Sequence, residues 1–182
     1  MILFLDFDGV LHPHMRHEPD FCRLPQLWKI LRACPDTRVV FSTSWREIYS
    51  PAAMIEFVAS GEGKDLAHRV VGSTPSLERE GRYGRRDLEI QAWLDSNNHS
   101  GLWLALDDIP EIFCGQHPNL YVVDGSTGLT DADVATIIQR IRPRIRRCYT
   151  LAELLAASDY SQPQPAEERV WIDSPAVGDE LI

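Results

Sequence analysis

Short apolar runs alternate along this chain with segments of helical period, and this alternation restricts the folds that it can adopt. The runs are residues 2–5, 39–41, 70–71, 102–106 and 120–123. Between them apolar residues recur three and four positions apart, as in residues 24–31. This order is typical of βα units around a mainly parallel sheet. The sequence therefore predicts an α/β fold.

Local signals predict where several helices begin and end. Pro25 suits a first helical turn, and Cys34-Pro35 would end that helix. Ser50-Pro51 predicts the start of a second helix, which Gly61 could close. Further helices are expected around residues 88–94, 130–142 and 150–155. A surface loop between Gly72 and Gly84 should connect the third strand to the first of them.

Composition indicates one soluble domain. The chain has 182 residues, of which 44% are hydrophobic and 25% charged, and its longest apolar runs fall far short of a membrane span. We therefore expect no membrane partner. The net charge of −9 argues against sequence-specific or non-specific binding to duplex DNA, although a nucleic-acid end remains a possible substrate.

Charge and composition also divide the chain. Residues 159–182 contain six acids and one arginine, a net charge of −5, so that −9 − (−5) = −4 remains for residues 1–158. We predict a folded domain over residues 1–158 and an acidic, proline-containing tail over 159–182. The four cysteines are widely spaced and no signal peptide is evident, so we expect free, buried thiols in a reducing, cytoplasmic setting.

Acidic residues follow two of the predicted strands. Asp6 and Asp8 come where the run 2–5 ends, and Asp107 and Asp108 end the run 102–106. In parallel sheets the ligand crevice lies at the carboxyl ends of the strands, so these carboxylates should converge. Such a group favours a hard cation such as Mg²⁺. Taken alone, Asp6-Phe-Asp-Gly9 could equally form a simple turn.

The sequence Asp6-Phe7-Asp8-Gly9 resembles the first motif of haloacid dehalogenase-like (HAD) phosphatases. Thr43, after an apolar run, looks like the second motif, with Ser42 and Ser44 as neighbouring registers, and Asp107-Asp108 looks like the fourth. The resemblance covers roughly residues 1–142 and is greatest to small HAD domains of bacteria and phages, some of them linked to RNA repair. It implies a three-layer, Rossmann-like α/β/α fold.

One motif departs from the superfamily pattern. The third motif is usually a lysine, but Lys29 and Lys64 are the only lysines and neither opens the helix before the fourth motif. Arg86, or Arg85 beside it, takes that position. The planar guanidinium group of an arginine can donate two hydrogen bonds to one phosphoryl group.

The resemblance implies a role for each motif residue. Asp6 would be the nucleophile, forming an aspartyl-phosphate, and Asp8 the general acid and base, with a raised pKa. Mg²⁺ would bind Asp6, the main-chain carbonyl of Asp8 and Asp107, with Asp108 as a further candidate ligand. The phosphoryl group would be bound by residues of the second and third motifs: Thr43, Ser44, Arg86 and Arg85.

Two other clusters have several interpretations. His12, His14 and His17 could form a transition-metal site, line the mouth of the active site, or be simply exposed. The basic run Arg140, Arg142, Arg144, Arg146 and Arg147 could be a solvated face, complement a helix dipole, or bind a polyanionic substrate.

The spacing of the motifs leaves little room for a cap domain. About 34 residues separate Asp8 from Thr43 and about 42 separate Thr43 from Arg86, and both segments must also hold core helices. An open site would admit large phosphorylated substrates, with nucleic-acid ends slightly favoured over small molecules. A non-catalytic Mg²⁺- and phosphate-binding or signalling module and a HAD phosphotransferase remain as alternatives, and the oligomeric state stays open. Receiver domains fit less well, because they place the phospho-acceptor on a later strand.

Overall fold

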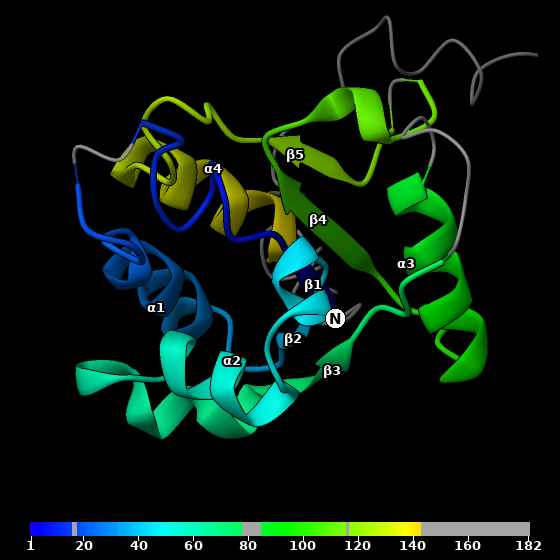
Figure 1. Ribbon diagram of the computed structural model, residues 1–182, viewed down its shortest axis with the longest axis horizontal. Coiled ribbons are helices and arrows are strands. Elements are labelled where there is room, and N and C mark those ends of the chain that lie inside the picture. Colours follow the sequence, from blue (N-terminus) through cyan, green and yellow to red (C-terminus); the bar gives the residue numbers. More distant parts are fainter. Residues whose placement is uncertain (16–17, 78–84, 116, 143–182) are drawn as a thin grey trace, which may run out of the picture. The chain divides into compact units, whose positions relative to one another are not determined.

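Within the described residues, five parallel strands form one sheet at the centre of the domain (Figure 1). The computed structural model describes residues 1–15, 18–77, 85–115 and 117–142. The strands are β1 Ile2–Leu5, β2 Arg38–Phe41, β3 Val70–Ser73, β4 Trp103–Asp107 and β5 Leu120–Val122, in the order β3-β2-β1-β4-β5. All four pairings are parallel. The five predicted strands and the parallel sheet are therefore confirmed.

Helices cover both faces of this sheet. The α-helices are α1 Leu24–Ala33, α2 Pro51–Val58, α3 Arg85–Ser96 and α4 Asp131–Ile141, and the 3-10 helices are η1 Ser44–Glu47, η2 Gly61–Arg69 and η3 Pro110–Ile112. Apolar side chains of α1, α2 and α4 pack against one face of the sheet, and those of α3 pack against the other. The predicted three-layer α/β/α arrangement is confirmed.

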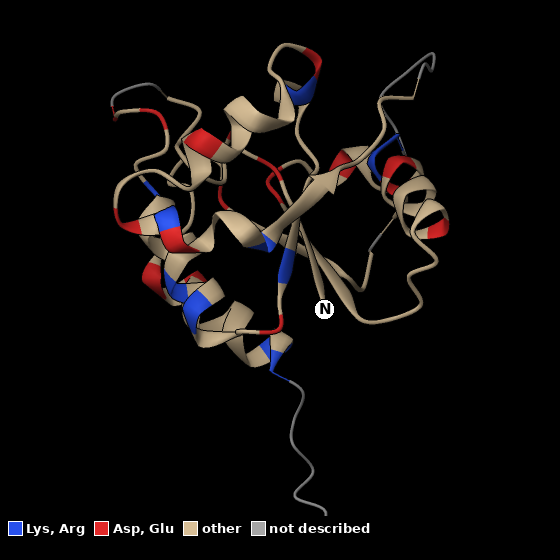
Figure 2. Cartoon of the chain, turned by 90° about the horizontal axis from the view of Figure 1, so that it is seen from below, with Lys and Arg blue, Asp and Glu red and all other residues tan. Residues whose placement is uncertain are grey.

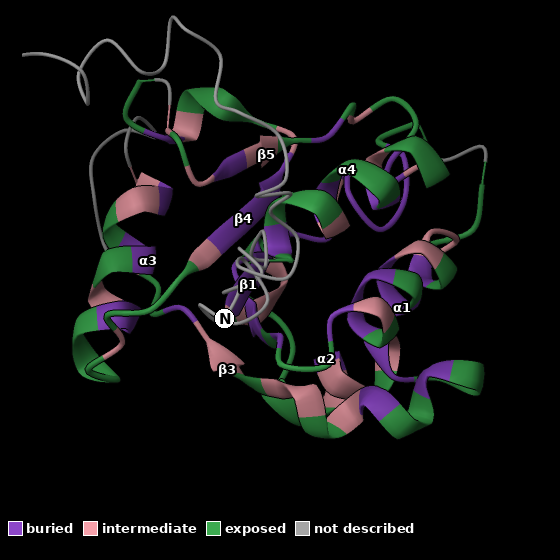
Figure 3. Ribbon diagram, turned by 180° about the vertical axis from the view of Figure 1, so that it is seen from behind, coloured by how far each residue is buried: buried purple, intermediate pink, exposed green. Residues whose placement is uncertain are grey.

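The central strand explains why the chain needs two covering layers. All four residues of β1 are buried, because alternate side chains enter the two cores: Leu3 and Leu5 on one face, Ile2 and Phe4 on the other. The helices show a buried side toward the sheet and an exposed side away from it (Figure 3). Charged residues accordingly lie mainly on helices and loops (Figure 2).

The helix starts predicted within the described residues are present, but one predicted end is wrong. Ser50 Oγ accepts a hydrogen bond from the Ala53 amide at the start of α2. That helix ends at Val58 rather than at Gly61, since the Trp28 indole N–H donates a hydrogen bond to the Val58 carbonyl at 2.9 Å. Gly61, with a φ of 55°, instead begins η2.

The cysteine expectation holds in part. Cys22 and Cys34 are free thiols; Cys34 is buried and Cys22 is half-buried, whereas Cys114 is exposed. Cys148 lies outside the described residues. The expectation that the thiols are buried is thus wrong for Cys114, because the chain returns to the surface after the buried Phe113.

The described elements all belong to one unit, Met1–Arg144, and residues 145–182 form a second unit outside the described residues. The helix expected near residues 150–155 and the tail at 159–182 fall in that second part, so the boundary at residue 158 stays a prediction. Among the described residues no helix is long and apolar enough to cross a membrane. The described parts of the two segments between the motifs belong to the domain itself and contain no separate cap.

Candidate active site

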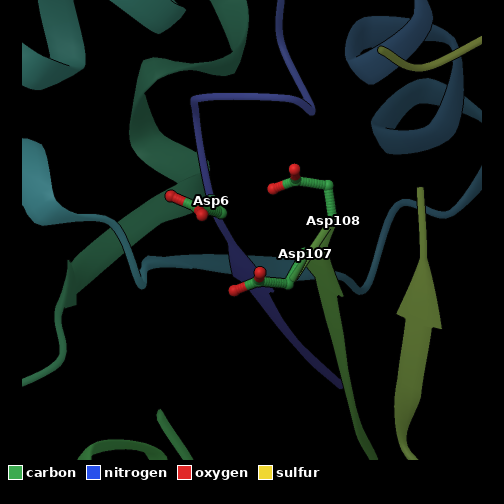
Figure 4. Close-up of side chains that lie close together, drawn as sticks. All are labelled: Asp6, Asp107 and Asp108. Carbon is green, nitrogen blue, oxygen red and sulfur yellow. The ribbon is translucent and has the colours of Figure 1, made fainter. Parts of the chain in front are cut away.

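Three carboxylates meet at the carboxyl edge of the sheet (Figure 4). Asp6 directly follows β1, Asp107 ends β4, and Asp108 comes next in the chain. One oxygen from each lies within 4.8 Å of the others. Because β1 and β4 are hydrogen-bonded parallel neighbours, their ends place these side chains at one site.

Burial makes this group of acids electrostatically costly. Asp6 is 5% exposed and Asp107 only 1%. Burial raises the pKa of Asp6, and the nearby Arg86 guanidinium opposes that rise. Burial, and then the negative charge of Asp6, raises the pKa of Asp107 well above its usual range. A bound cation would favour the ionised form of both groups.

Two glycines bring the backbone close to Asp108. Gly9 has a φ of 68°, and a Cβ there would overlap the Asp108 carboxylate. A Cβ on Gly125 would lie 2.5 Å from Asp108 Oδ2. Oδ1 of Asp108 is buried and has no hydrogen-bond partner among the described residues. An unpartnered buried carboxylate oxygen beside two further acids fits an oxygen-liganded cation such as Mg²⁺.

Arg86 contacts two of the three carboxylates. Its Nη2 lies 3.5 Å from Asp6 Oδ2 and its Nε lies 3.3 Å from Asp107 Oδ2. Arg85 points elsewhere, with Nη2 at 3.1 Å from Glu47 Oε1 and Nε at 3.0 Å from Glu89 Oε1. Of the two predicted arginines, Arg86 is therefore the one that contacts the candidate nucleophile.

The second motif is positioned by the end of β2. The Ser42 amide donates to the Leu5 carbonyl at 2.8 Å and so continues the sheet. Thr43 is fully buried, and its Oγ1 accepts a hydrogen bond from the Trp45 amide at the start of η1. A hydrogen bond from Thr43 also lowers the pKa of Asp6. Thr43, rather than Ser42, thus borders the carboxylates, and Ser44 lines the adjoining cavity.

Two ring nitrogens hold the Asp8 side chain. His12 Nε2 lies 3.1 Å from Oδ1, and the Trp45 indole donates to Oδ2 at 2.8 Å. The Phe21 amide donates to His12 Nδ1, which leaves Nε2 to carry the proton toward Asp8. The hydrogen bond from His12, more than any other interaction, lowers the pKa of Asp8. The raised pKa expected from the sequence is therefore wrong, because both carboxylate oxygens already face donors.

Two neighbouring histidines contact acidic residues of the site. His12 is only 5% exposed and contacts Asp8, while His14 Nε2 contacts Asp108 Oδ2. His17 lies outside the described residues. Among the described side chains no histidine belongs to a group of three that could hold a metal ion.

Sequence reasoning missed two buried charges next to the site. Glu89 in α3 is 1% exposed, and its Oε2 accepts a hydrogen bond from Arg46 Nη2 at 2.6 Å. The available signal was an acid on the same helix face as Ile90 and Trp93, where an apolar residue is expected. Together with the motif residues they border a cavity of about 270 Å³. Its lining consists of Asp6, Asp8, Ser44, Arg46, Glu47, Arg85, Arg86, Glu89, Asp108, Ile109 and Ile112.

The described part of the basic run contacts the domain itself. Arg140 donates to the Leu120 carbonyl and lies over the Tyr121 ring, 5.2 Å from its centroid. Arg142 donates to the Ala33 carbonyl. The other three arginines of the run lie outside the described residues.

Comparison with known proteins agrees with this geometry. The family described as "HAD domain in Swiss Army Knife RNA repair proteins" matches residues 2–134. The chain belongs to this HAD family. Its HAD domain therefore has the fold of that superfamily, and membership indicates a hydrolase of the phosphatase type in general terms.

A second similarity concerns a different kind of protein. The chain is 44% identical to Antitoxin PemI of Escherichia coli over 57 residues, which cover 29% of this chain and 67% of the antitoxin. No solved structure is significantly similar to the chain.

Proposed function

We propose that the HAD domain is a Mg²⁺-dependent phosphomonoesterase in which Asp6 is the nucleophile. The supporting observation is the contact of Arg86 with both Asp6 and Asp107 at the carboxylate cluster. A guanidinium in that place can bind the oxygens of a phosphoryl group while a carboxylate attacks phosphorus. It fills the role that a lysine has in most of the superfamily.

The reaction has two steps. An oxygen of Asp6 forms a bond to phosphorus, the bond to the leaving oxygen breaks, and that oxygen takes a proton from Asp8. Water then attacks the phosphorus of the aspartyl-phosphate and gives its proton to Asp8. The bond to Asp6 breaks, and inorganic phosphate leaves. Thr43, Ser44 and Arg86 bind the phosphoryl oxygens throughout.

Asp8 must change its protonation state between the two steps. Hydrogen bonds from His12 and Trp45 favour its ionised form, which is the form that accepts a proton from water. A phosphoryl dianion entering beside Asp8 opposes that ionisation and favours the protonated form needed in the first step. The two donors also hold the carboxylate in one orientation.

The side chains of Asp6, Asp107 and Asp108 would hold Mg²⁺, together with the main-chain carbonyl of Asp8. The unpartnered Asp108 oxygen and the burial of the other two acids support this donor set. When bound, the ion offsets negative charge on the nucleophile and on the phosphoryl oxygens.

We propose phosphorylated nucleic-acid ends as the substrates. The family description refers to RNA repair proteins, and no cap covers the site within the described residues. An open site can admit the end of a long polymer. The negative net charge agrees with recognition of the end rather than of the duplex backbone.

Substitution of Asp6 tests the proposal. Asp6→Asn should abolish Mg²⁺-dependent hydrolysis of an aryl phosphate and of 3′- and 5′-phosphorylated oligonucleotides, because an amide is a poor nucleophile. Asp95→Asn, which changes an exposed acid at the end of α3, is the matched control and should retain full activity. Phosphate release by an Asp6→Asn protein at the wild-type rate would contradict the assignment.

The same assay separates the alternative functions. Phosphate and Mg²⁺ binding without release from any substrate would favour a non-catalytic module. Transfer of the phosphoryl group to an added alcohol in preference to water would favour a phosphotransferase.

We propose, as a second function, that residues after the HAD domain oppose a protein toxin. The similarity to Antitoxin PemI is short, and the unit that contains the described elements ends at Arg144, so that residues 145–182 remain for another role. Part of that stretch, residues 159–182, differs in composition from the HAD domain, with a net charge of −5. The phosphatase and the antitoxin activity would then belong to different parts of one chain.

Binding to the toxin that Antitoxin PemI opposes tests this second function. The full chain and its Asp6→Asn variant should both bind the purified toxin, measured by calorimetry, and restore growth of cells that express it. A chain ending at Arg144, which keeps every described element, should do neither. Equal toxin binding by the shortened chain would place the antitoxin function elsewhere, and no binding by the full chain would rule it out.

A further inference from the structure

Arg46 and Glu89 form a buried ion pair between two elements that are far apart in sequence. Arg46 belongs to η1 and Glu89 to α3, 43 positions later. Arg46 Nη2 and Glu89 Oε2 are 2.6 Å apart, and the two side chains are only 7% and 2% exposed. The pair therefore ties the second-motif segment directly to the helix that carries the third motif.

Each end of this ion pair continues to a phosphate-binding group. Arg46 Nη1 donates to the main-chain carbonyl of Thr43. On the other side, Glu89 Oε1 accepts from Arg85 Nε at 3.0 Å, and Glu89 Oε2 lies 4.0 Å from Arg86 Nη1. A continuous chain of polar contacts thus joins the Thr43 backbone to the two arginines at the start of α3.

Stability alone gives little reason for such a pair. Desolvation of two charges offsets most of their attraction, and an apolar pair of similar volume is often as stable. Burial lowers the pKa of Arg46, and its Nε is buried without a hydrogen-bond partner among the described residues. A charged pair retained in such surroundings points to a functional constraint.

The surroundings also argue against direct contact of Glu89 with a substrate. Both of its oxygens face arginine donors, and the Leu77 amide approaches Oε1 at 3.4 Å. A carboxylate would repel a phosphoryl group, whereas the arginines that it contacts would attract one. The charge of Glu89 therefore acts on the arginines and not on the substrate.

We propose that Arg46 and Glu89 are positioning residues, which fix the second-motif backbone at Thr43 and Ser44 relative to Arg86 across the phosphoryl group. This inference rests on the proposed phosphatase function. Displacement of a phosphate-binding group by about 1 Å can cost about 10²-fold in rate. The ion pair connects the second-motif segment to α3, and these two segments carry the groups proposed to bind the phosphoryl group. Loss of the pair would therefore produce such a displacement.

Replacing the whole pair by apolar residues separates positioning from stability. The Arg46→Met/Glu89→Leu double variant should keep an unfolding midpoint close to that of the wild type. Its kcat for an aryl phosphate should fall about 10²-fold, and its affinity for orthovanadate, a mimic of the reacting phosphoryl group, should fall in parallel. Mg²⁺ affinity should change less than threefold, since neither residue belongs to the carboxylate cluster.

A matched control removes an ion pair of another region. Lys29 Nζ and Asp131 Oδ1 are 2.7 Å apart and join α1 to α4 at the surface. The Lys29→Met/Asp131→Leu variant should keep both kcat and vanadate affinity. Should the Arg46→Met/Glu89→Leu protein not fold, Glu89→Gln, which retains the shape of the side chain, should still lower kcat about tenfold with an unchanged KM.

The outcomes are distinct. A folded double variant, or a Glu89→Gln variant, with wild-type kcat and vanadate affinity would overturn the positioning role. If the wild type binds vanadate but hydrolyses no phosphate ester, the proposed function fails, and weaker vanadate binding by the variants would still support the positioning role. If the wild type neither binds vanadate nor hydrolyses an ester, both proposals fail.

Discussion

At the scale of single residues, two glycines beside Asp108 are important because they have no side chain. Gly9 and Gly125 allow the backbone to approach Asp108 from two sides, where any Cβ would collide with its carboxylate. Gly9 additionally has a positive φ, so a substitution there would strain the backbone. Gly125 has no such restriction and therefore isolates the effect of crowding.

Gly125→Ala should weaken Mg²⁺ binding without unfolding the protein. The added methyl group would lie 2.5 Å from Asp108 Oδ2 and 2.7 Å from His14 Cδ2, and the flexible carboxylate would move away from the cluster. We expect a loss of about 10-fold to 100-fold in affinity, as for other changes that misorient metal ligands. Calorimetric titration with Mg²⁺ measures it.

Gly61→Ala provides the comparison, because nothing lies within 4 Å of a Cβ there. It should leave Mg²⁺ affinity unchanged, although its positive φ costs some stability. Equal affinities for the Gly125→Ala and wild-type proteins would show that the position of Asp108 does not matter for the ion.

At the scale of elements, local sequence signals fix where helices begin. Thr130 and Asp133 form a capping box at the start of α4: Thr130 Oγ1 accepts from the Asp133 amide at 3.3 Å and Asp133 Oδ2 accepts from the Thr130 amide at 2.8 Å. Tyr121 of β5 also donates to Asp133 Oδ1, at 2.6 Å. One acid thus caps the helix and connects it to the sheet.

Removal of the cap hydroxyl should destabilise the domain. Thr130→Ala leaves an amide of the first turn without its acceptor and should lower the free energy of unfolding by about 1 kcal/mol. Thr130→Ser keeps the hydroxyl and should lose much less. Urea unfolding of the three proteins measures the difference, and identical midpoints for the alanine and wild-type proteins would contradict the role of the cap.

The hydrogen bond from Tyr121 to Asp133 should make stability depend on pH in alkaline solution. Burial, followed by the hydrogen bond to Asp133, raises the pKa of Tyr121 from 10.0 to about 12. Between these values the unfolded chain loses the phenolic proton while the folded protein keeps it, so stability is complete below pH 10 and falls as the pH rises toward 12. Unfolding midpoints measured from pH 9 to 12 should fall less steeply for Tyr121→Phe than for the wild type, and parallel curves would contradict this.

The end of α2 marks the limit of such local signals. Gly61 predicts a helix end, but the chain leaves the helix after Val58 because Trp28, from α1, binds that carbonyl. A Cβ on Gly63 would overlap the same indole. No pattern within residues 50–61 contains this contact, which exists only after two helices have packed together.

At the scale of the whole molecule, the sheet concentrates negative charge at one edge. One oxygen from each of three acids lies within 4.8 Å of the others, and two of these acids are buried. Of the three, Arg86 contacts only Asp6 and Asp107, so a bound cation should relieve the remaining repulsion. Binding of Mg²⁺ to the folded state alone should therefore stabilise the entire domain.

Thermal unfolding should reveal this linkage. At a Mg²⁺ concentration about 100 times its Kd, binding adds about 2.7 kcal/mol, which corresponds to a rise in Tm of about 5–10 °C for a chain of this size. Asp107→Asn should lose most of this shift, because it removes one of the carboxylates that would hold the ion. Asp95→Asn should shift like the wild type, and equal shifts in all three proteins would exclude this cluster as the ion site.

Residue order alone specifies the layers of the fold and the sheet edge at which the acids gather. Short apolar runs and segments with a period of 3.6 residues specify strands and helices locally, and acids after strands 2–5 and 102–106 must share an edge once those strands run parallel. Only the packing of the elements shows which arginine contacts Asp6, how His12 and Trp45 orient Asp8, and that Arg46 forms an ion pair with Glu89. Apart from the contact of His12 with Asp8, these contacts join segments tens of residues apart, and their distances and local dielectric exist only in the packed molecule.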